Sequence, residues 1–431
     1  MKDVLPGHRV LLLQGPMGPF FKRLAERLSR QGAFCWKINF NGGDWFYFRG
    51  PNAVDFRGEI EEWGGFLRRF LVGNRIDLVY LFGDCREQHK IAREVCAELA
   101  VRVLVFEEGY IRPDYITLEE GGVNALSSIP RDAQFYRDLP EEPEPPRRPA
   151  QFCFRRMAAA AVLYYLFSSL LRWRYWRYEH HKSLSPLKKG YLWLRSGIRK
   201  KLYQSRDRLT TGRLASELSK RYFLVALQVH NDSQVVEHSP YRSIEEFIGE
   251  VMESFALHAP KHVFLVIKHH PMNRGHHHYG ALIAALAGRH GIGGRVIYAH
   301  DLHLPTCLDH ALGVVMINST VGLSALLHGA PTKVLGEAFY DLPGLTCQKP
   351  LGEFWSAPSP VDRELYNRLR HYLIEKTQLN GSFYGLLPFP EEVPASFPAE
   401  YRFGPAGHAP EPCPAIHAGK EMPLLSIKDA A

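Results

Sequence analysis

Short apolar runs alternate with longer amphipathic stretches along the first third of the chain. The apolar runs are rich in β-branched and aromatic residues and lie at 9–13, 34–40, 78–82 and 102–106. Apolar residues recur every three or four positions in the stretches between them, at 20–30, 59–70 and 86–99. The runs predict buried strands, and the spacing predicts helices that cover a sheet. We therefore expect a parallel sheet with right-handed crossovers here.

The same alternation returns after residue 221. It predicts strands at 222–227, 263–268, 296–298, 313–317 and 333–335, and helices at 244–257, 279–289 and from 321 to 329. Because 431 residues are more than one core usually holds, we expect two domains of this kind. The predicted fold is α/β, with two Rossmann-like domains (1–140 and 211–387) that face each other across a cleft. The proline-rich tail, 388–431, is expected to be disordered.

A basic aromatic segment, residues 141–210, separates the two predicted domains. Within it, 147–208 holds 16 Lys and Arg but only two acids, whereas the whole chain has a net charge of +8, so the remaining residues are net negative. The apolar stretch 157–171 is shorter than the roughly 20 residues that span a bilayer. Its predicted role is therefore a helix that lies at a surface.

Cationic and aromatic side chains interleave directly after that stretch, at Arg172, Trp173, Arg174, Trp176 and Arg177. Such a pattern suits a membrane interface, where rings sit at the headgroup level and cations meet anionic lipid. It also suits nucleic acid, which aromatic and arginine side chains bind by stacking and charge. A helical bridge between domains is a third interpretation. We favour the membrane, because nucleic acid would leave the apolar helix unexplained.

Cysteine usage and the N-terminus indicate the compartment. Seven scattered cysteines without metal-ligand spacing favour a reducing environment. The N-terminal residues lack the basic and then apolar pattern of a signal peptide. We therefore expect a cytoplasmic protein.

Two carboxylates follow the fourth predicted strand directly. Glu107 and Glu108 come after 102–106, then Gly109 allows a turn, and Arg112 adds a cation. Ligands of open α/β sheets bind at the carboxyl ends of strands, and a nearby cation keeps a carboxylate ionised. The pair is thus a candidate catalytic site, although a solvated acidic turn has the same sequence.

The second half offers groups suited to a phosphate. His270 and Pro271 follow the strand 263–268, and an imidazole there can donate to a phosphate or stabilise a leaving group. Asn318, Ser319 and Thr320 lie between a strand and a helix, where hydroxyl and amide groups can hold a phosphate. A structural histidine and an ordinary helix cap are the alternatives. The histidines at 269–278 lack a paired frame with acids, so we expect no metal site.

The order Glu-Glu-Gly, His-Pro and Ser-Thr resembles three short motifs of bacterial sialyltransferases, polysialyltransferases and Kdo transferases, which use CMP-activated keto-sugars. Four longer stretches, 11–21, 37–45, 107–124 and 230–235, resemble the KpsS/LipB family of capsular polysaccharide export proteins. The resemblance covers most of residues 8–350. Relatives often have Asp where this chain has Glu108.

The resemblance implies a GT-B-like glycosyltransferase without cofactor or metal at the chemical step. It would transfer Kdo from CMP-β-Kdo to a phosphatidylglycerol-type phospholipid at the inner membrane, with retention of configuration, and so begin the poly-Kdo linker of a capsule. Other capsule biosynthesis and export proteins would be partners, and nucleic acid would not. The alternatives are a non-catalytic capsule export adaptor and a transferase for another CMP-keto-sugar, such as sialic acid.

The same resemblance distributes roles among residues. Glu108, with Glu107, would be catalytic; His270, Pro271, Asn318, Ser319 and Thr320 would hold the CMP phosphate; and Arg112 would pair with the Kdo carboxylate. Gln14, Asn41 and Asp44 would line the acceptor side. The basic aromatic segment would bring the enzyme to an anionic lipid surface, so the resemblance implies a cytoplasmic protein that is peripheral to the inner face of the inner membrane.

Overall fold

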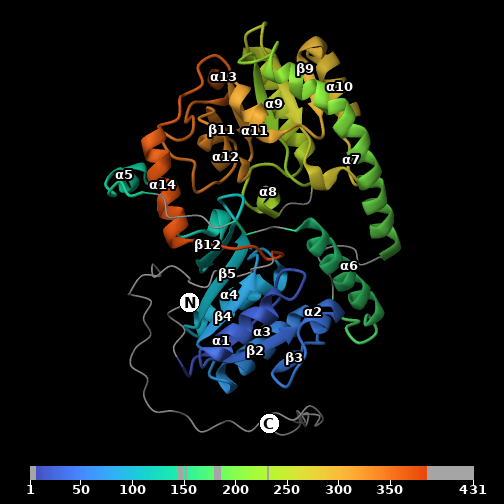
Figure 1. Cartoon of the computed structure of the whole chain (residues 1–431), viewed down its shortest axis with the longest axis vertical. Coiled ribbons are helices and arrows are strands. Elements are labelled where there is room, and N and C mark those ends of the chain that lie inside the picture. The colour runs from blue at the N-terminus through green and yellow to red at the C-terminus, as the bar shows by residue number, and fades with distance from the viewer. Residues whose placement is uncertain (1–5, 144–148, 151–152, 179–185, 231–232, 386–431) are drawn as a thin grey trace, which may run out of the picture.

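The computed structural model describes residues 6–143, 149–150, 153–178, 186–230 and 233–385. These residues form two α/β domains, each built on its own sheet (Figure 1). This confirms the predicted architecture of two Rossmann-like domains. The tail predicted to be disordered lies outside the described residues.

The first sheet has seven strands in the order β12-β6-β5-β4-β1-β2-β3. Their bounds are β1 Arg9–Leu12, β2 Phe34–Asn39, β3 Ala53–Asp55, β4 Leu78–Phe82, β5 Arg102–Glu108, β6 Tyr115–Glu120 and β12 Gln378–Asn380. Strands β3, β2, β1, β4 and β5 run parallel, and all of them except the three-residue β3 were predicted. Because these strands are parallel, the side chains that follow their carboxyl ends lie along one edge of the sheet.

Two strands at the other end of this sheet depart from the prediction. No strand was predicted at 115–120, but these residues form β6, which pairs antiparallel with β5 and places Thr117 opposite Glu107. Strand β12 then pairs antiparallel with β6. The alternation of Tyr115, Thr117 and Glu119 with apolar neighbours is typical of a strand, although both faces are buried here.

Helices cover both faces of the first sheet. Helix α1 (Phe20–Arg30) packs on the face that holds Val10, Leu12 and Tyr80. Helices α3 (Ile60–Gly73) and α4 (Glu87–Glu98) pack on the opposite face. Successive residues of each strand therefore enter different cores, as the alternation of strand side chains requires.

The second sheet has five parallel strands in the order β11-β10-β7-β8-β9. Their bounds are β7 Tyr222–Ala226, β8 Phe264–Lys268, β9 Val296–Ala299, β10 Gly313–Met316 and β11 Thr332–Val334. Helices α9 (Ile244–His258) and α10 (Gly280–Arg289) cover one face. Helices α11 (Leu304–His310) and α12 (Val321–Leu327) cover the other.

Shorter elements complete the two domains. They are the α-helices α2 Gly42–Tyr47, α5 Ala133–Arg137, α8 Ser233–Glu237 and α13 Leu351–Phe354, and the 3₁₀ turns η1 Asn124–Leu126, η2 Pro271–Asn273 and η3 Gly293–Arg295. Helices α2 and α8 begin shortly after strands β2 and β7, so both stand at carboxyl edges of their sheets.

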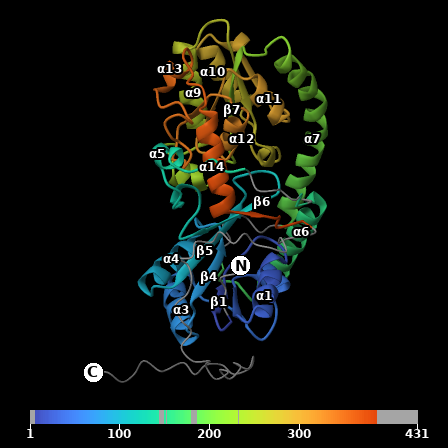
Figure 2. The same ribbon diagram turned by 60° about the vertical axis from the view of Figure 1, so that its left-hand side comes forward.

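Three long helices connect the domains. Helix α6 (Phe154–Leu170) packs beside the first domain, and α7 (Pro186–Ala215) continues along the same side to the second (Figures 1 and 2). Helix α14 (Arg363–Lys376) returns on another side and leads into β12. The predicted second domain, 211–387, is therefore too long, because residues 378–385 belong to the first domain, where Phe383 packs between Phe20 and Phe106.

None of the helices in the described ranges has the length and apolar character needed to cross a membrane.

Candidate active site

The two predicted carboxylates are the last residues of β5. Strand β5 continues two residues beyond the predicted end because β6 pairs with it there. The Thr117 hydroxyl donates to the Glu108 carbonyl at 3.0 Å, and the Glu108 amide donates to Glu107 Oε1 at 2.9 Å. These bonds fix the backbone on which both acids are presented.

The protein environment raises the pKa of both acids. Burial raises the pKa of Glu107 to about 7, and the charges of Glu108 and Asp84 add to that effect. Burial also raises the pKa of Glu108, while the Arg112 guanidinium lowers it. Glu108 is nevertheless exposed to solvent. Glu108 is thus accessible to a substrate. The protein around the carboxylate reduces its hydration, which is why its pKa is raised.

Arg112 connects the two domains electrostatically. Its Nε donates to the Gly109 carbonyl at 3.1 Å, which folds the side chain back over the loop after β5. Its charge acts on Glu108 of the first domain and on His270 of the second. Arg112 is thus within electrostatic range of both Glu108 and His270, two residues that the sequence analysis also placed in the candidate site.

A residue near the C-terminal end of the fold holds this loop. Gln378 of β12 is 2% exposed, and its Oε1 accepts from the amides of Tyr110 (2.9 Å) and Ile111 (3.3 Å). Its Nε2 donates to the Thr117 hydroxyl at 3.0 Å. No local pattern could predict this role, because the two segments lie more than 260 positions apart.

His270 lies directly before the 3₁₀ turn η2 and caps it. Its Nδ1 accepts from the Met272 amide at 3.2 Å. Burial lowers the pKa of His270 to about 4, and the charges of Lys268 and Arg112 contribute. At neutral pH the ring is therefore uncharged, and its one proton is on Nε2 because Nδ1 accepts a hydrogen bond. Pro271 is the first residue of the turn.

The predicted phosphate-binding residues lie between β10 and α12. Asn318 and Gln228 bond to each other twice, at 3.0 and 3.1 Å, which joins the ends of β7 and β10. Ser319 Oγ accepts from the Val321 amide at 3.2 Å. Thr320 is the N-cap residue by position, and its side chain makes no capping bond. In this structure Ser319 acts as a local cap, and phosphate binding stays a prediction.

The three predicted acceptor residues are buried against α6. Gln14, Asn41 and Asp44 are 1%, 2% and 6% exposed. Asn41 Nδ2 donates to the Tyr164 hydroxyl at 2.7 Å, and that hydroxyl donates to Asp44 Oδ1 at 3.2 Å. In this structure these side chains hold α6 on the first domain. Contact with an acceptor stays a prediction that the arrangement does not favour.

Asn41 also begins a short helix that the sequence pattern did not predict. Its Oδ1 accepts from the amides of Gly43 (2.8 Å) and Asp44 (3.1 Å), which makes it the N-cap of α2. Helix α2 packs on α6, and the rings of Phe46 and Phe167 stack at 3.9 Å. The small residues at 42 and 43 allow this close approach.

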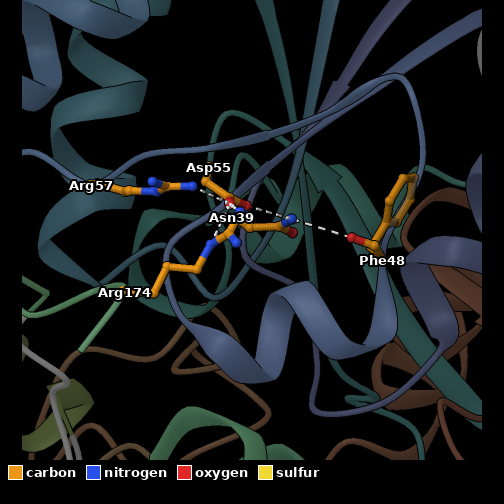
Figure 3. A network of polar contacts seen from close by, with 5 residues as sticks. All are labelled: Asn39, Phe48, Asp55, Arg57 and Arg174. Carbon is orange, nitrogen blue, oxygen red and sulfur yellow. Dashed lines mark hydrogen bonds and ion pairs between the residues drawn. The ribbon is translucent and has the colours of Figure 1, made fainter. Parts of the chain in front are cut away.

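The five predicted membrane residues divide into two groups. Figure 3 shows Arg174 pointing to Asp55, with which it pairs at 2.6 Å, and Asn39 and Arg57 bind the same carboxylate. Arg177 lies 3.8 Å from Glu59 and 3.7 Å from Glu62. Arg172, Trp173 and Trp176 are exposed, Trp173 at 74% and Trp176 at 69%. Arg174 therefore fixes the turn after α6, while the tryptophans extend from it.

Sequence reasoning missed two side chains near the acids. Arg86 donates to Gln14 Oε1 at 2.7 Å. Its positive charge lowers the pKa of Glu107 and so offsets part of the increase that burial causes. The pKa of Tyr384 is raised, mainly by burial and secondly by the nearby charge of Glu108. Arg86 begins a predicted helix and was assigned no role. Tyr384 is distant in sequence, so only the fold reveals its position.

Comparison with known proteins identifies the family. The family model of capsule polysaccharide biosynthesis proteins matches residues 77–384. The chain is 46% identical over 381 residues to the capsule polysaccharide export protein KpsS of Escherichia coli, covering 88% of this chain and 98% of that protein. It is 42% identical over 394 residues to the capsule polysaccharide modification protein LipB of Neisseria meningitidis serogroup A, covering 89% and 93%.

Among solved structures, the β-Kdo 2,7 transferase of Thermosulfurimonas dismutans KpsC is similar with a TM-score of 0.38 and 15% sequence identity, covering 83% of this chain and 89% of that one. The family assignment rests on the sequence matches, which extend over most of the chain and include the strands, the loop after β5 and the Ser319 junction. The chain belongs to the capsule polysaccharide biosynthesis protein family that includes KpsS and LipB.

Proposed function

We propose that the protein is a retaining glycosyltransferase that moves Kdo from CMP-β-Kdo to a (lyso)phosphatidylglycerol lipid and so initiates the poly-Kdo linker of a capsule. The observation that carries this proposal is that the charge of Arg112 acts both on Glu108 in the first domain and on His270 in the second. Membership of a capsule biosynthesis family supports the pathway. No cofactor or metal is assigned to the transfer step.

The donor would lie between the two sheets. The Nε2–H of His270 would donate to a phosphate oxygen of CMP, and Arg112 would pair with the Kdo carboxylate. The backbone around Asn318, Ser319 and Thr320 would border the same phosphate. An uncharged imidazole with a fixed tautomer suits this task, because it donates a hydrogen bond without needing to change protonation.

Glu108 would supply the carboxylate that retention requires. In one route it attacks the anomeric carbon, the bond to the CMP oxygen breaks, and CMP leaves with the electron pair; the lipid hydroxyl then displaces Glu108 from the adduct. In the other route, the lipid hydroxyl attacks the anomeric carbon from the same face that CMP leaves. Glu107, with a pKa of about 7, can take up the proton that the acceptor hydroxyl loses.

The exposed face of α6 and its following turn supports a lipid acceptor. Its exposed apolar side chains are Phe154, Val162, Leu163, Leu166, Leu170, Trp173 and Trp176. Exposed cations border it at Arg155, Arg156 and Arg172. An apolar surface rimmed by cations is what an amphipathic element presents to an anionic bilayer.

The proposal is tested by mass spectrometry of a short-chain phosphatidylglycerol after incubation with the protein and CMP-Kdo generated in situ. A product heavier by one Kdo establishes donor, acceptor and transfer together. If a product forms only with CMP-sialic acid, the donor is CMP-sialic acid and not CMP-Kdo. Absence of any product and of CMP binding would favour a non-catalytic export adaptor.

Replacing His270 with alanine should weaken CMP binding by roughly 10- to 100-fold, because a hydrogen bond to a charged group contributes about 1.5–3 kcal/mol. Isothermal titration calorimetry measures the change. The exposed His262 on the same domain provides the control, since H262A should bind CMP as the unaltered protein does. An unchanged affinity in H270A would remove this residue from the phosphate site.

Replacing Leu170, Trp173 and Trp176 with aspartate should reduce binding to anionic vesicles by at least about 30-fold, because each large apolar side chain contributes about 1.5–3 kcal/mol on burial. These residues are exposed, so folding should survive. Vesicle flotation measures binding, and activity on a soluble short-chain acceptor should stay within about twofold.

The matched control replaces three exposed apolar residues elsewhere, Val72, Leu257 and Leu327, with aspartate. It should leave vesicle binding unchanged. Equal losses in the two triple variants would show that this face has no special affinity for lipid.

A further inference from the structure

Three metal-ligating side chains from the two domains meet beside the proposed transfer site, since the Asn318 side chain donates to the His238 carbonyl at 3.1 Å. Cys85 lies in the loop after β4, Glu237 is the last residue of α8, and His238 follows it. One ligand atom from each of the three lies within 4.8 Å of the others. Because 152 positions separate Cys85 from Glu237, only the packing of the two domains creates this cluster.

The histidine of the cluster has an imidazole nitrogen available for a ligand. The His238 side chain is 13% exposed, and its Nε2 is buried without a hydrogen-bond partner among the residues that the structure describes. Its Nδ1 lies 3.8 Å from Glu337. A buried polar atom without a partner is costly, so a ligand at this nitrogen would remove that cost.

The other two groups are held close by local contacts. The Cys85 thiol donates to Asp84 Oδ1 at 3.2 Å, and Asp84 in turn accepts from the Val123 amide at 2.8 Å. Glu237 Oε1 pairs with Lys90 Nζ at 2.8 Å, which leaves its second oxygen for coordination. Lys90 belongs to α4, so this ion pair already joins the same two domains.

We propose that Cys85, Glu237 and His238 form a binding site for a divalent metal ion of the Zn²⁺ class. Thiolate, imidazole and carboxylate are the ligand set of zinc, whereas Mg²⁺ and Ca²⁺ take oxygen ligands. Three protein ligands leave a fourth tetrahedral position for water. The thiol must lose its proton on binding, so metal uptake releases a proton.

The site links the two domains, and none of its three ligands is assigned a part in transfer. One ligand comes from the edge of the first sheet, and two come from the last residue of α8 and the residue after it in the second domain. Only the packed arrangement of the domains therefore presents all three. An ion that binds this arrangement alone shifts the domains toward it. The inference is independent of the proposed function, because it concerns metal affinity and not Kdo transfer.

A second cluster provides an internal comparison. Glu142, His371 and Glu375 also place ligand atoms within 4.8 Å of one another, but the set has no thiolate and Glu142 is exposed. It is therefore expected to bind cobalt more weakly and without a sulfur signature.

The experiment is a titration of the reduced, metal-free full chain with Co²⁺, followed by absorption spectroscopy. One equivalent should bind with tetrahedral d–d bands and a near-ultraviolet thiolate-to-cobalt charge-transfer band. Cys85→Ser should abolish the charge-transfer band, and His238→Ala should weaken Co²⁺ binding by at least roughly 100-fold, the upper end of what loss of an outer-shell partner costs. Cys153 is a half-buried cysteine outside the cluster. Cys153→Ser should leave the charge-transfer band and the Co²⁺ affinity unchanged.

Hydrogen exchange then tests the link between domains. Zn²⁺ should slow exchange both in the loop after β4 and in α8 of the unaltered protein, and in neither segment of Cys85→Ser. A charge-transfer band that survives in Cys85→Ser, or Zn²⁺ protection confined to one domain, would overturn the proposal. Loss of the band in His371→Ala instead of His238→Ala would do the same by placing the metal at the other cluster.

Discussion

Glu108→Gln should lower Kdo transfer by about a thousandfold or more while CMP binding stays within about twofold. The substitution keeps the shape of the side chain and removes its charge and nucleophilic oxygen. CMP contacts are expected from the second domain, so donor affinity should not depend on this carboxylate. Rates of product formation from CMP-Kdo and CMP titration calorimetry measure the two quantities separately.

Glu120→Gln is the matched control for that result. Glu120 ends strand β6 and forms an ion pair with Arg102 at 2.8 Å, so it is an acid of the same sheet that is remote from Arg112 and His270. It should transfer Kdo at nearly the normal rate. Full activity in E108Q would exclude Glu108 as the nucleophile and move attention to Glu107.

Gly42→Ala should destabilise the protein by about 3 kcal/mol or more, which is the upper end of the usual cost of overpacking. A methyl group at this position would overlap the main-chain oxygen of Phe167 and the Leu171 side chain. Because a backbone atom cannot move aside as a side chain can, α6 must shift away from α2. Denaturant unfolding measures the loss, and limited proteolysis within 154–170 measures the release of α6.

Gly212→Ala in helix α7 provides the control. No atom lies within 4 Å of a methyl group built there, and alanine favours helix by about 1 kcal/mol over glycine. This variant should be as stable as the unaltered protein or slightly more stable. If Gly42→Ala were equally harmless, the close approach of α2 to α6 would not exist in solution.

The sequence alone predicted the parallel strands well, because their apolar character is local. The run at 78–82 coincides with β4, and 20–30 coincides with α1. The position of Glu107 and Glu108 at a carboxyl edge also followed from the strand before them. Each of these predictions needed only neighbouring residues and the alternation of strand and helix.

The features that the sequence did not reveal depend on partners far along the chain. Strand β12 has three residues, too few for a pattern, and exists because β6 offers an edge. Gln14, Asn41 and Asp44 looked available at a sheet edge, but α6 covers them from more than 100 positions away. Arg174 looked like a lipid contact until the fold placed Asp55 beside it. A polar side chain in a sequence does not reveal what will cover it.

The return of the chain through α14 into β12 has a consequence for biosynthesis. During translation the second sheet, residues 222–334, can form as soon as its own strands have emerged. The loop that carries Gly109 and Arg112 must wait for Gln378, the residue that holds the Tyr110 and Ile111 amides. The edge that carries the proposed catalytic residues is therefore completed near the end of synthesis. A chain terminated before residue 378 would contain every proposed catalytic residue but would lack the side chain that holds the loop after β5.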